Sequence, residues 1–352
     1  MGCLRLLLAI AVINNHLPDR IKMLSGDEAV RLFFIISGFY MTLILTKKYH
    51  SVWLFYSNRF LRLYPSYAVI VVASIGWFCF DWLYIGHRPP PEWFQEANAE
   101  MRWWQWLGLQ FSNVTMIGLD IPSLFHWREG FLFLYGPADK TPDGAEWMGW
   151  YPWIRQSWSI GAEIWFYLLA PALVRWSTLA LIAIAAASCS IMVMVHSPLI
   201  YYLFLANLWL FIVGVLLFRW YQTWDQIPNA LGILTLVYVF VACLLTSTIA
   251  NSMVHTAVLG SVALSVPILF KSFANKKWDT FIGELSYPVY LVHLLVISIL
   301  SAVLHVHSFI SATLASIVVG GLMVRYIEIP MDGFRQDRLN ARPMRLKVAA
   351  DT

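Results

Sequence analysis

The chain contains a series of continuous apolar runs, each long enough to cross a lipid bilayer as a helix. A membrane helix needs roughly 17–25 apolar residues, whereas the strands of a membrane barrel alternate over about ten. Hydrophobic residues make up 59% of the 352-residue chain and charged residues 12%, against about 45–50% and about 25% in soluble domains. The sequence therefore predicts an all-α membrane protein, a polytopic bundle of transmembrane helices.

We expect about ten spans, with both termini on the cytoplasmic side. Lys and Arg concentrate in the segments that this orientation places inside, and the outer turns near 196, 251 and 306 have none. The turn at 18–28 is the main exception among the short loops. The expected spans cover residues 3–17, 29–46, 63–85, 157–175, 178–195, 198–218, 230–249, 253–271, 283–304 and 307–325.

Outside the spans, the sequence predicts one long outer loop at 86–156 within a membrane domain at 1–330, and a basic, mobile cytoplasmic tail at 331–352. The loop is rich in Trp, which is typical of membrane interfaces. An interfacial aromatic belt is therefore favoured over a stacking platform for a sugar or lipid-linked glycan. Segments 103–119 and 124–135 are apolar enough to lie in the interface or to re-enter the membrane, and both possibilities stay open.

The first apolar run, from Cys3 to His16, ends in Asn14, Asn15 and His16. A cleaved signal peptide is the less favoured interpretation, because a basic leading region and a small-x-small cleavage site are absent. Polar side chains at membrane depth are costly, so they commonly serve a function inside a bundle. The four cysteines lie in apolar runs without metal-ligand spacing, so we expect neither a disulfide framework nor a metal site.

Two further charged groups are candidates for a functional site. Arg59 and Arg62 are three residues apart and share one face of a helix, where two guanidinium groups could bind phosphates. The simpler interpretation, a positive-inside anchor, is favoured on charge alone. Glu163 lies about two turns into an otherwise apolar span, where an ionisable group is usually functional.

Two candidates near the C-terminal end admit simpler interpretations. His293 lies at mid-depth of the ninth span, where a hydrogen-bonded packing role is about as probable as a functional one. Glu328 is three residues from Arg325, so the two could form no more than a local ion pair.

Taken together, these motifs resemble the acyltransferase-3 family of multi-pass membrane acyltransferases, of the bacterial envelope-glycan O-acetyltransferase type. The resemblance runs over nearly the whole chain, although Arg31 stands where the family often has an acidic residue. The motifs that carry it are Arg5 with His16, the segment Phe33 to Phe39 containing Ser37-Gly38-Phe39, Arg59 and Arg62 with Pro65, Trp158 through Glu163, Phe166 and Tyr167 to Pro171, Ser286 to His293, and Glu328 with Pro330.

The resemblance implies transfer of an acyl group, usually acetyl, from acyl-CoA to a hydroxyl of a cell-envelope saccharide. We expect His16 and Glu163 to be catalytic, His16 as general base because imidazole has an ordinary pKa of about 6.5. Glu163 would orient or support His16. Arg59 and Arg62 would bind the donor, and Asn15, Ser37 and His293 are secondary candidates. An acyl-histidine intermediate is the mechanistic alternative.

The remaining expectations concern cofactors, partners and location. Acyl-CoA is expected as a donor substrate, with no permanently bound cofactor, no metal and no nucleic-acid partner. The expected partners are acyl-CoA, a saccharide or lipid-linked glycan acceptor and membrane lipids, in the bacterial cytoplasmic (inner) membrane. The alternative function is a transporter or flippase with a buried His, Glu and Arg pathway.

Overall fold

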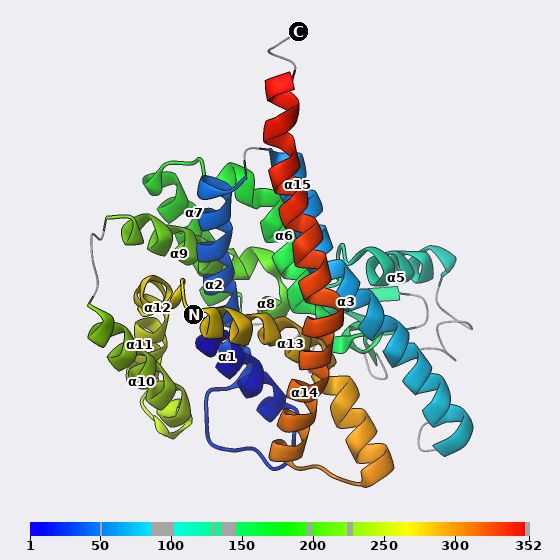
Figure 1. The fold of residues 1–352 in the computed structure, drawn as a ribbon. Helices are drawn as coiled ribbons and strands as arrows, with labels where there is room; N and C mark the ends of the chain where they lie inside the picture. Colours follow the sequence, from blue (N-terminus) through cyan, green and yellow to red (C-terminus); the bar gives the residue numbers. More distant parts are fainter. Residues whose placement is uncertain are drawn as a thin grey trace.

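The computed structural model is a bundle of helices with a small sheet at one side (Figure 1). It describes residues 1–49, 51–85, 102–128, 131–134, 146–195, 199–223 and 228–348. The helices are α1 (Gly2–Asn15), α2 (Gly26–Lys47), α3 (Val52–Phe80), α5 (Trp103–Thr115), α6 (Trp158–Leu173), α7 (Thr178–Met194), α8 (Leu199–Tyr202), α9 (Phe204–Tyr221), α10 (Asn229–Leu245), α11 (Ser252–Leu264), α12 (Val266–Phe273), α13 (Lys277–Leu304), α14 (Phe309–Met323) and α15 (Ile329–Val348), and the strands are β1 (Phe125–Arg128), β2 (Phe131–Leu134) and β3 (Glu146–Trp147).

Within the described part of the chain, seven helical segments are long and apolar enough to cross a membrane. This confirms an all-α membrane protein as the general class. Each of the ten predicted spans contains a helix, but α1, α6 and α7 have only 14, 16 and 17 residues. Ten crossings and the predicted orientation therefore stay predictions. The seven segments are Gly26–Lys47, Val52–Ile85, Phe204–Tyr221, Leu231–Thr248, Ser252–Phe273, Lys277–Leu304 and Phe309–Asn340.

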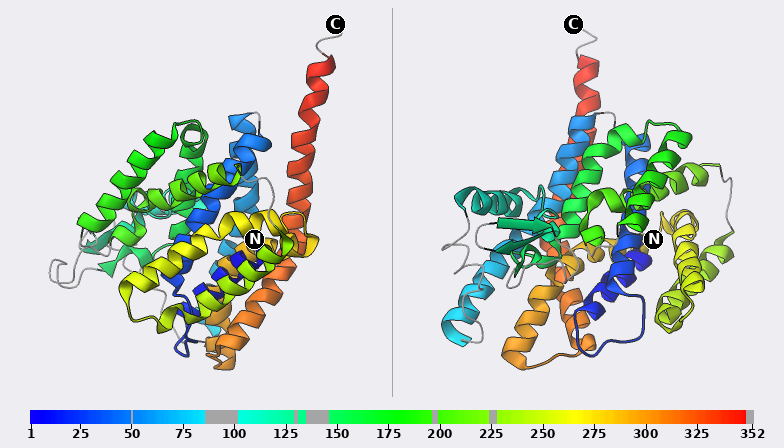
Figure 2. Two further views of the ribbon diagram at one scale, coloured as in Figure 1. Left: turned by 90° about the vertical axis from the view of Figure 1, so that its left-hand side faces the viewer. Right: turned by 180° about the vertical axis from the view of Figure 1, so that it is seen from behind.

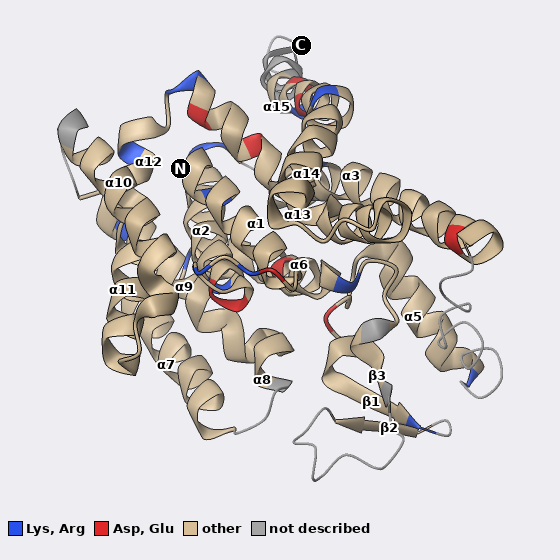
Figure 3. Ribbon diagram, turned by 90° about the horizontal axis from the view of Figure 1, so that it is seen from below, with Lys and Arg blue, Asp and Glu red and all other residues tan. Residues whose placement is uncertain are grey.

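Charged residues are sparse along most of these helices (Figure 3). Helices α7, α10, α11 and α14 carry no Asp, Glu, Lys or Arg at all. Their outward side chains are apolar and exposed, as in Leu179, Leu234 and Leu314. An apolar exterior of this kind is what a lipid environment requires, because lipid tails cannot solvate a charge.

Helix α1 lies between α2 and α13 and forms the centre of the core. Its first backbone amides, of Gly2 and Cys3, donate hydrogen bonds to the buried Asp279 carboxylate of α13 at 2.9 and 3.1 Å. A carboxylate at a helix N-terminus also matches the positive end of the helix dipole. Gly2 is required here because a Cβ atom would lie 1.7 Å from the Asp279 carbonyl oxygen.

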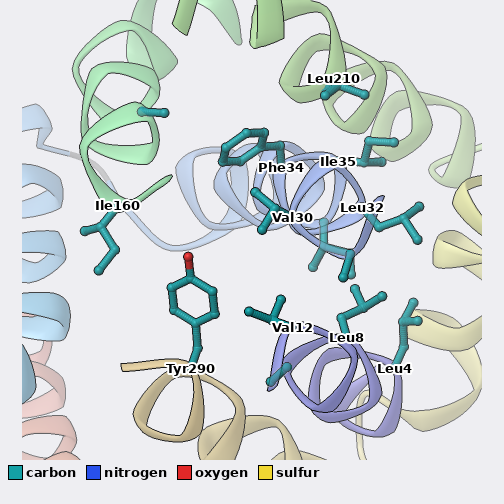
Figure 4. Close-up of a cluster of buried hydrophobic side chains, with 14 of the residues drawn as sticks. Leu4, Leu8, Val12, Val30, Leu32, Phe34, Ile35, Ile160, Leu210 and Tyr290 are labelled. Carbon is teal, nitrogen blue, oxygen red and sulfur yellow. The ribbon is translucent and has the colours of Figure 1, made fainter. Parts of the chain in front are cut away.

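The apolar face of α1 packs against α2 (Figure 4). Leu8 and Val12 point toward α2, and Val30 and Leu32 extend from α2 into the same cluster. Tyr290 reaches into this region from α13 with its hydroxyl directed away from its own helix. The cluster therefore fixes α1, α2 and α13 relative to one another.

Two glycines allow α2 and α9 to approach closely. A Cβ atom on Gly38 would lie 2.0 Å from the carbonyl oxygen of Phe211, and one on Gly214 would lie 2.1 Å from that of Ile35. Both distances are well inside van der Waals contact. Small residues at such crossings are the usual device for packing membrane helices.

The loop predicted at 86–156 contains a helix and a three-stranded antiparallel sheet in the order β2-β1-β3. Within the apolar segment at 124–135, residues Phe125–Arg128 and Phe131–Leu134 form strands β1 and β2, with Phe125 opposite Leu134. Membrane re-entry of the loop stays a prediction. On α5, Trp103 is 74% exposed, whereas the Trp127 side chain is buried under the sheet. The loop Trp residues therefore divide into an exposed group on α5 and a packed group, while Trp93 lies outside the described residues.

The segment predicted as a mobile tail is helical where the structure describes it, and its mobility stays a prediction. Residues 329–348 form α15, which continues from α14 through a short π-helical segment and extends beyond the other helices (Figure 2). Arg338 anchors it by donating to Asn58 and Ser57 of α3 at 3.0 and 2.8 Å. Polar contacts with α3, which the sequence pattern does not show, give the tail its structure.

The close crossing of α2 and α9 generates a stability prediction. The variant Gly38→Ala should destabilise the protein by about 1–3 kcal/mol, because the added methyl forces the two helices apart. The measurement is thermal unfolding of the detergent-solubilised protein. Gly260→Ala on α11 is the matched control, since its Cβ atom meets nothing within 4 Å. Equal unfolding temperatures for both variants would contradict the packing argument.

Asp120, in the turn after α5, generates a prediction on pH. Burial raises the pKa of this carboxyl to about 6, although a 3.0 Å hydrogen bond from the Trp165 indole opposes the rise. The native state then holds a proton that the unfolded state releases above its ordinary pKa of 3.8. Stability should therefore fall as the pH rises from about 4 to about 6, by on the order of 2–3 kcal/mol.

The replacement Asp120→Asn should remove this part of the pH dependence. Urea or thermal unfolding of both proteins at several pH values provides the measurement. A variant with the same slope as the wild type between pH 4 and pH 6 would show that another group is responsible.

Candidate functional site

A cavity of about 250 Å³ lies inside the bundle between α1, α2, α3, α6 and α13. Its wall combines aromatic and aliphatic side chains with an unusual number of polar groups for a membrane protein. Those polar and tyrosine residues are Arg5, Ser37, Tyr40, Arg59, Arg62, Ser159, Glu163, Tyr167, Ser286, Tyr287 and Tyr290. The concentration of polar groups identifies this cavity as the candidate site.

Three arginines from two helices line the cavity: Arg5 from the first turn of α1, and Arg59 and Arg62 from α3. The last two are one helical turn apart, as the sequence predicts. The Arg5 guanidinium lies 6.0 Å from the centre of the Tyr40 ring, within cation–π range. Arg59 has a buried Nε without a hydrogen-bond partner among the described residues. The Arg59 Nε is therefore available to donate a hydrogen bond to an anionic ligand.

Arg62 forms an ion pair with Glu328, which is 4% exposed and follows α14. Ser66 Oγ donates to the other Glu328 carboxylate oxygen at 2.5 Å. The suggested local pair of Glu328 with Arg325 is wrong. Arg325 is exposed, and among the described residues the Glu328 carboxylate pairs with Arg62 and Ser66 instead.

Glu163 supplies the one carboxylate of the cavity wall. Its Oε1 atom accepts hydrogen bonds from Ser37 Oγ at 2.6 Å and from the Tyr167 hydroxyl at 2.5 Å. Tyr167 lies one turn further along α6, so the sequence spacing itself brings the two side chains together. Among the residues described, none donates to Glu163 Oε2, which leaves that atom for the cavity.

His16 lies elsewhere, at the carboxyl end of α1, and does not line the cavity. Its exposed ring contacts the ring of His293 on α13, with the centroids 5.2 Å apart. Neighbouring Asn14 holds the following turn through two hydrogen bonds with the backbone of Ile21, at 2.8 and 2.9 Å. Asn15 packs against Gly26 at the start of α2.

His293 is completely buried, and its Nδ1 lies 2.6 Å from the carbonyl oxygen of Tyr290. A carbonyl only accepts, so Nδ1 carries the hydrogen and Nε2 is left with a lone pair. That Nε2 atom is buried without a hydrogen-bond partner in the described structure. His293 is therefore poised to accept a hydrogen bond.

Tyr290 belongs to both groups of residues. It lines the cavity, and its ring centroid is 5.8 Å from that of His293. Its hydroxyl is fixed by Ser159 Oγ at 2.6 Å and by the backbone carbonyl of Gln156 at 2.9 Å. The Tyr290 side chain thus stands between the arginine cavity and the histidine pair.

The structure therefore divides the predicted site residues into two sets. Arg59, Arg62, Ser37 and Glu163 share the cavity, whereas His16, His293 and Asn15 lie beyond it. No hydrogen bond joins Glu163 to His16 in the described residues; the ring beside His16 is that of His293.

Sequence reasoning also missed the cavity positions of Arg5, Tyr167 and Tyr290, although all three belong to the motifs named above. An arginine in the first turn of an apolar helix was the available signal for Arg5. No group of three His, Cys, Asp or Glu side chains that could hold a metal ion occurs in the part of the chain that the structure describes.

Comparison with known proteins supports one assignment. A family model described as an acyltransferase domain matches residues 1–325, which include the cavity and both histidines. Curated proteins and solved structures give no match. The family match covers all of the motifs except the terminal Glu328 and Pro330. With helices that can span a membrane and this match over most of its length, the chain belongs to the acyltransferase-3 family of multi-pass membrane acyltransferases.

Proposed function

We propose that the protein transfers an acetyl group from acetyl-CoA to a hydroxyl of a cell-envelope saccharide at the bacterial cytoplasmic membrane. The observation that carries the proposal is the cavity, which brings Arg5, Arg59 and Arg62 together with Glu163 inside an apolar bundle. A cationic cavity of this kind suits a ligand with phosphate groups and a long, thin uncharged arm. Acyl-CoA has that form.

The donor phosphates bind the α3 arginines. Guanidinium groups bind phosphates through paired N–H donors, and the Nε donor of Arg59 has no partner among the described residues. Arg62 forms an ion pair with Glu328, which fixes the orientation of its guanidinium group, so Arg62 offers the phosphates a positioned positive charge. The pantetheine arm then lies along the cavity toward Tyr290. The donor reaches the site from the cytoplasm in the predicted orientation, in which the N-terminal end of α1 and the whole of α15 lie on the cytoplasmic side.

His16 acts on the acceptor from the opposite end of α1. Eleven residues separate Arg5 from His16, which is about 16 Å along a helix at roughly 1.5 Å per residue. His16 takes the proton of the acceptor hydroxyl while the oxygen attacks the thioester carbonyl. The C–S bond then breaks, and the CoA sulfur receives that proton from His16. Movement of the Tyr290 side chain brings thioester and His16 into contact.

His293 replaces Glu163 as the group expected to orient His16. The two rings are in contact, and the neutral His293 ring has a lone pair on Nε2 that can accept the second N–H of His16. Glu163, fixed by Ser37 and Tyr167, balances the positive charge of the cavity. A covalent acyl-His16 intermediate is the alternative path for the same overall transfer.

Loss of the His16 imidazole should abolish acyl transfer without preventing donor binding. His16→Ala should lower the rate of saccharide O-acetylation by about 10²–10⁴-fold, the usual contribution of a general base. The measurement is envelope-glycan O-acetylation, by mass spectrometry, in a null strain complemented with each variant. His307→Ala, at an exposed position, is the histidine control.

Three results would count against this proposal. A His16→Ala protein that is present at normal levels and still acetylates would remove His16 from the reaction. Inside-out vesicles that fail to use added radiolabelled acetyl-CoA, while right-side-out vesicles use it, would reverse the assigned donor side. Transport of an unmodified glycan by either preparation would favour the flippase alternative.

Replacement of Arg59 provides the cleaner test of donor binding. Arg62→Gln would strand the buried Glu328 carboxylate at a cost of about 3–5 kcal/mol, whereas Arg59→Gln leaves no such group. Arg59→Gln should raise the KM for acetyl-CoA by roughly tenfold, with a smaller dependence on salt. Arg325→Gln, an exposed arginine, is the control. An unchanged KM and salt dependence would assign Arg59 to membrane anchoring.

A further inference from the structure

Helix α15 lies outside the residues matched by the family model, yet it is attached to α3 beside the arginine pair. The side chain of Asn58 donates to the backbone carbonyl of Arg335 at 3.4 Å. Arg338 donates to Asn58 and to Ser57, at 3.0 and 2.8 Å. Ser57 and Asn58 immediately precede Arg59 in sequence. These contacts fix the position of α15 relative to the donor-binding arginines.

Arg335 lies on the side of α15 that faces this region. It is only 7% exposed, and one of its terminal nitrogens pairs with Asp332. Its Nε atom is buried and has no hydrogen-bond partner among the described residues. Both Arg62 and Arg59 are close enough to act on it electrostatically. A buried donor without an acceptor, beside two other positive charges, is costly in a protein without a ligand.

The neighbouring carboxylates do not supply an acceptor for the Arg335 Nε. Glu328 is taken by Arg62 and Ser66, and Asp332 is taken by another nitrogen of Arg335. Glu284 also acts electrostatically on this group, but no hydrogen bond joins it to Arg335 in the described structure. An anionic ligand could therefore satisfy both Arg59 and Arg335.

The size of the cavity indicates which part of the donor would reach Arg335. A volume of about 250 Å³ is below the roughly 300–1,000 Å³ that encloses a drug-sized ligand, and acyl-CoA is larger than such a ligand. The cavity can take the thin arm and a phosphate at Arg59 and Arg62, so the rest of the nucleotide, with its remaining phosphates, must lie outside. Arg335 is not part of the cavity wall, and it neighbours the two arginines that are.

We propose that Arg335 is a third donor-binding arginine, which contacts the nucleotide phosphates of acyl-CoA outside the cavity. This inference rests on the proposed donor. It makes α15 part of the binding site, with Asn58, Ser57 and Arg338 as the contacts that position it. The thioester end of the donor is not expected to touch Arg335.

The test compares donors with and without the nucleotide in the purified full-length protein. Arg335→Gln should raise the KM for acetyl-CoA roughly tenfold and leave kcat unchanged at saturating donor. The KM for S-acetylpantetheine, which has no phosphate, should be the same in variant and wild type. Arg335→Lys should recover part of the acetyl-CoA affinity, because it keeps the charge without the planar fork.

The controls separate a ligand contact from a structural role. Asp332→Asn removes the ion-pair partner of Arg335 but keeps the guanidinium, so it should leave the KM for acetyl-CoA within about twofold of wild type. Equal losses with both donors in Arg335→Gln, or no loss with either, would overturn the proposal. If Arg335→Gln does not fold, the comparison of Arg335→Lys with wild type decides in the same way.

The experiment also distinguishes a wrong donor from a wrong role for Arg335. A wild-type protein that neither binds radiolabelled CoA nor uses acetyl-CoA would overturn the proposed function, and the role of Arg335 with it. A wild type that uses acetyl-CoA, together with an Arg335→Gln variant of unchanged KM, would overturn only the role of Arg335.

Discussion

A charged side chain inside a membrane bundle needs a partner, because lipid offers neither water nor counterions to solvate it. In this protein Arg62 and Glu328 meet that need together, with Ser66 on the second carboxylate oxygen. The pair joins α3 to the segment that follows α14. Its geometry fixes Arg59 one turn away, and it also sets where α15 leaves the bundle. Breaking the pair by removing one partner would cost about 3–5 kcal/mol, so the arrangement of the cavity depends on it.

Hydropathy was sufficient to locate the apolar helices, because each apolar run has to satisfy its own backbone hydrogen bonds, but it did not indicate the polar helix α15. It was insufficient for pairings between distant segments. Glu328 was assigned to Arg325 because residues three apart share a helix face, whereas the buried carboxylate finds Arg62 from α3. Strands β1 and β2 were missed because the Phe131–Leu134 segment, FLFL, is uniformly apolar and has no alternation. Helix α15 was missed because its contacts with Ser57 and Asn58 come from another part of the chain.

The site shows the same limit. The cost of a buried charge selected Glu163, helix spacing selected Arg59 and Arg62, and the family resemblance added Ser37. These residues do gather around one cavity, because buried polar groups pair with one another. The position of each side chain along its helix, relative to the cavity, could not be predicted in this way. Helix α1 is held against α13 at Gly2, so its carboxyl end reaches His293. Glu163, on α6, is held by Ser37 and Tyr167 within the cavity wall.

This division bears directly on mechanism. The positive charge of three arginines lies in the cavity wall, and the base that we assign lies beyond Tyr290, which is fixed by Ser159 and the Gln156 carbonyl. In the proposed reaction, donor and acceptor would bind at opposite ends of α1 without competing for the same groups. In the same proposal, the Tyr290 side chain would limit access of water from the acceptor side to the thioester, and so limit hydrolysis of the donor. The proposed reaction requires the Tyr290 side chain to move, and the two hydrogen bonds of its hydroxyl oppose that movement until the donor arm fills the cavity.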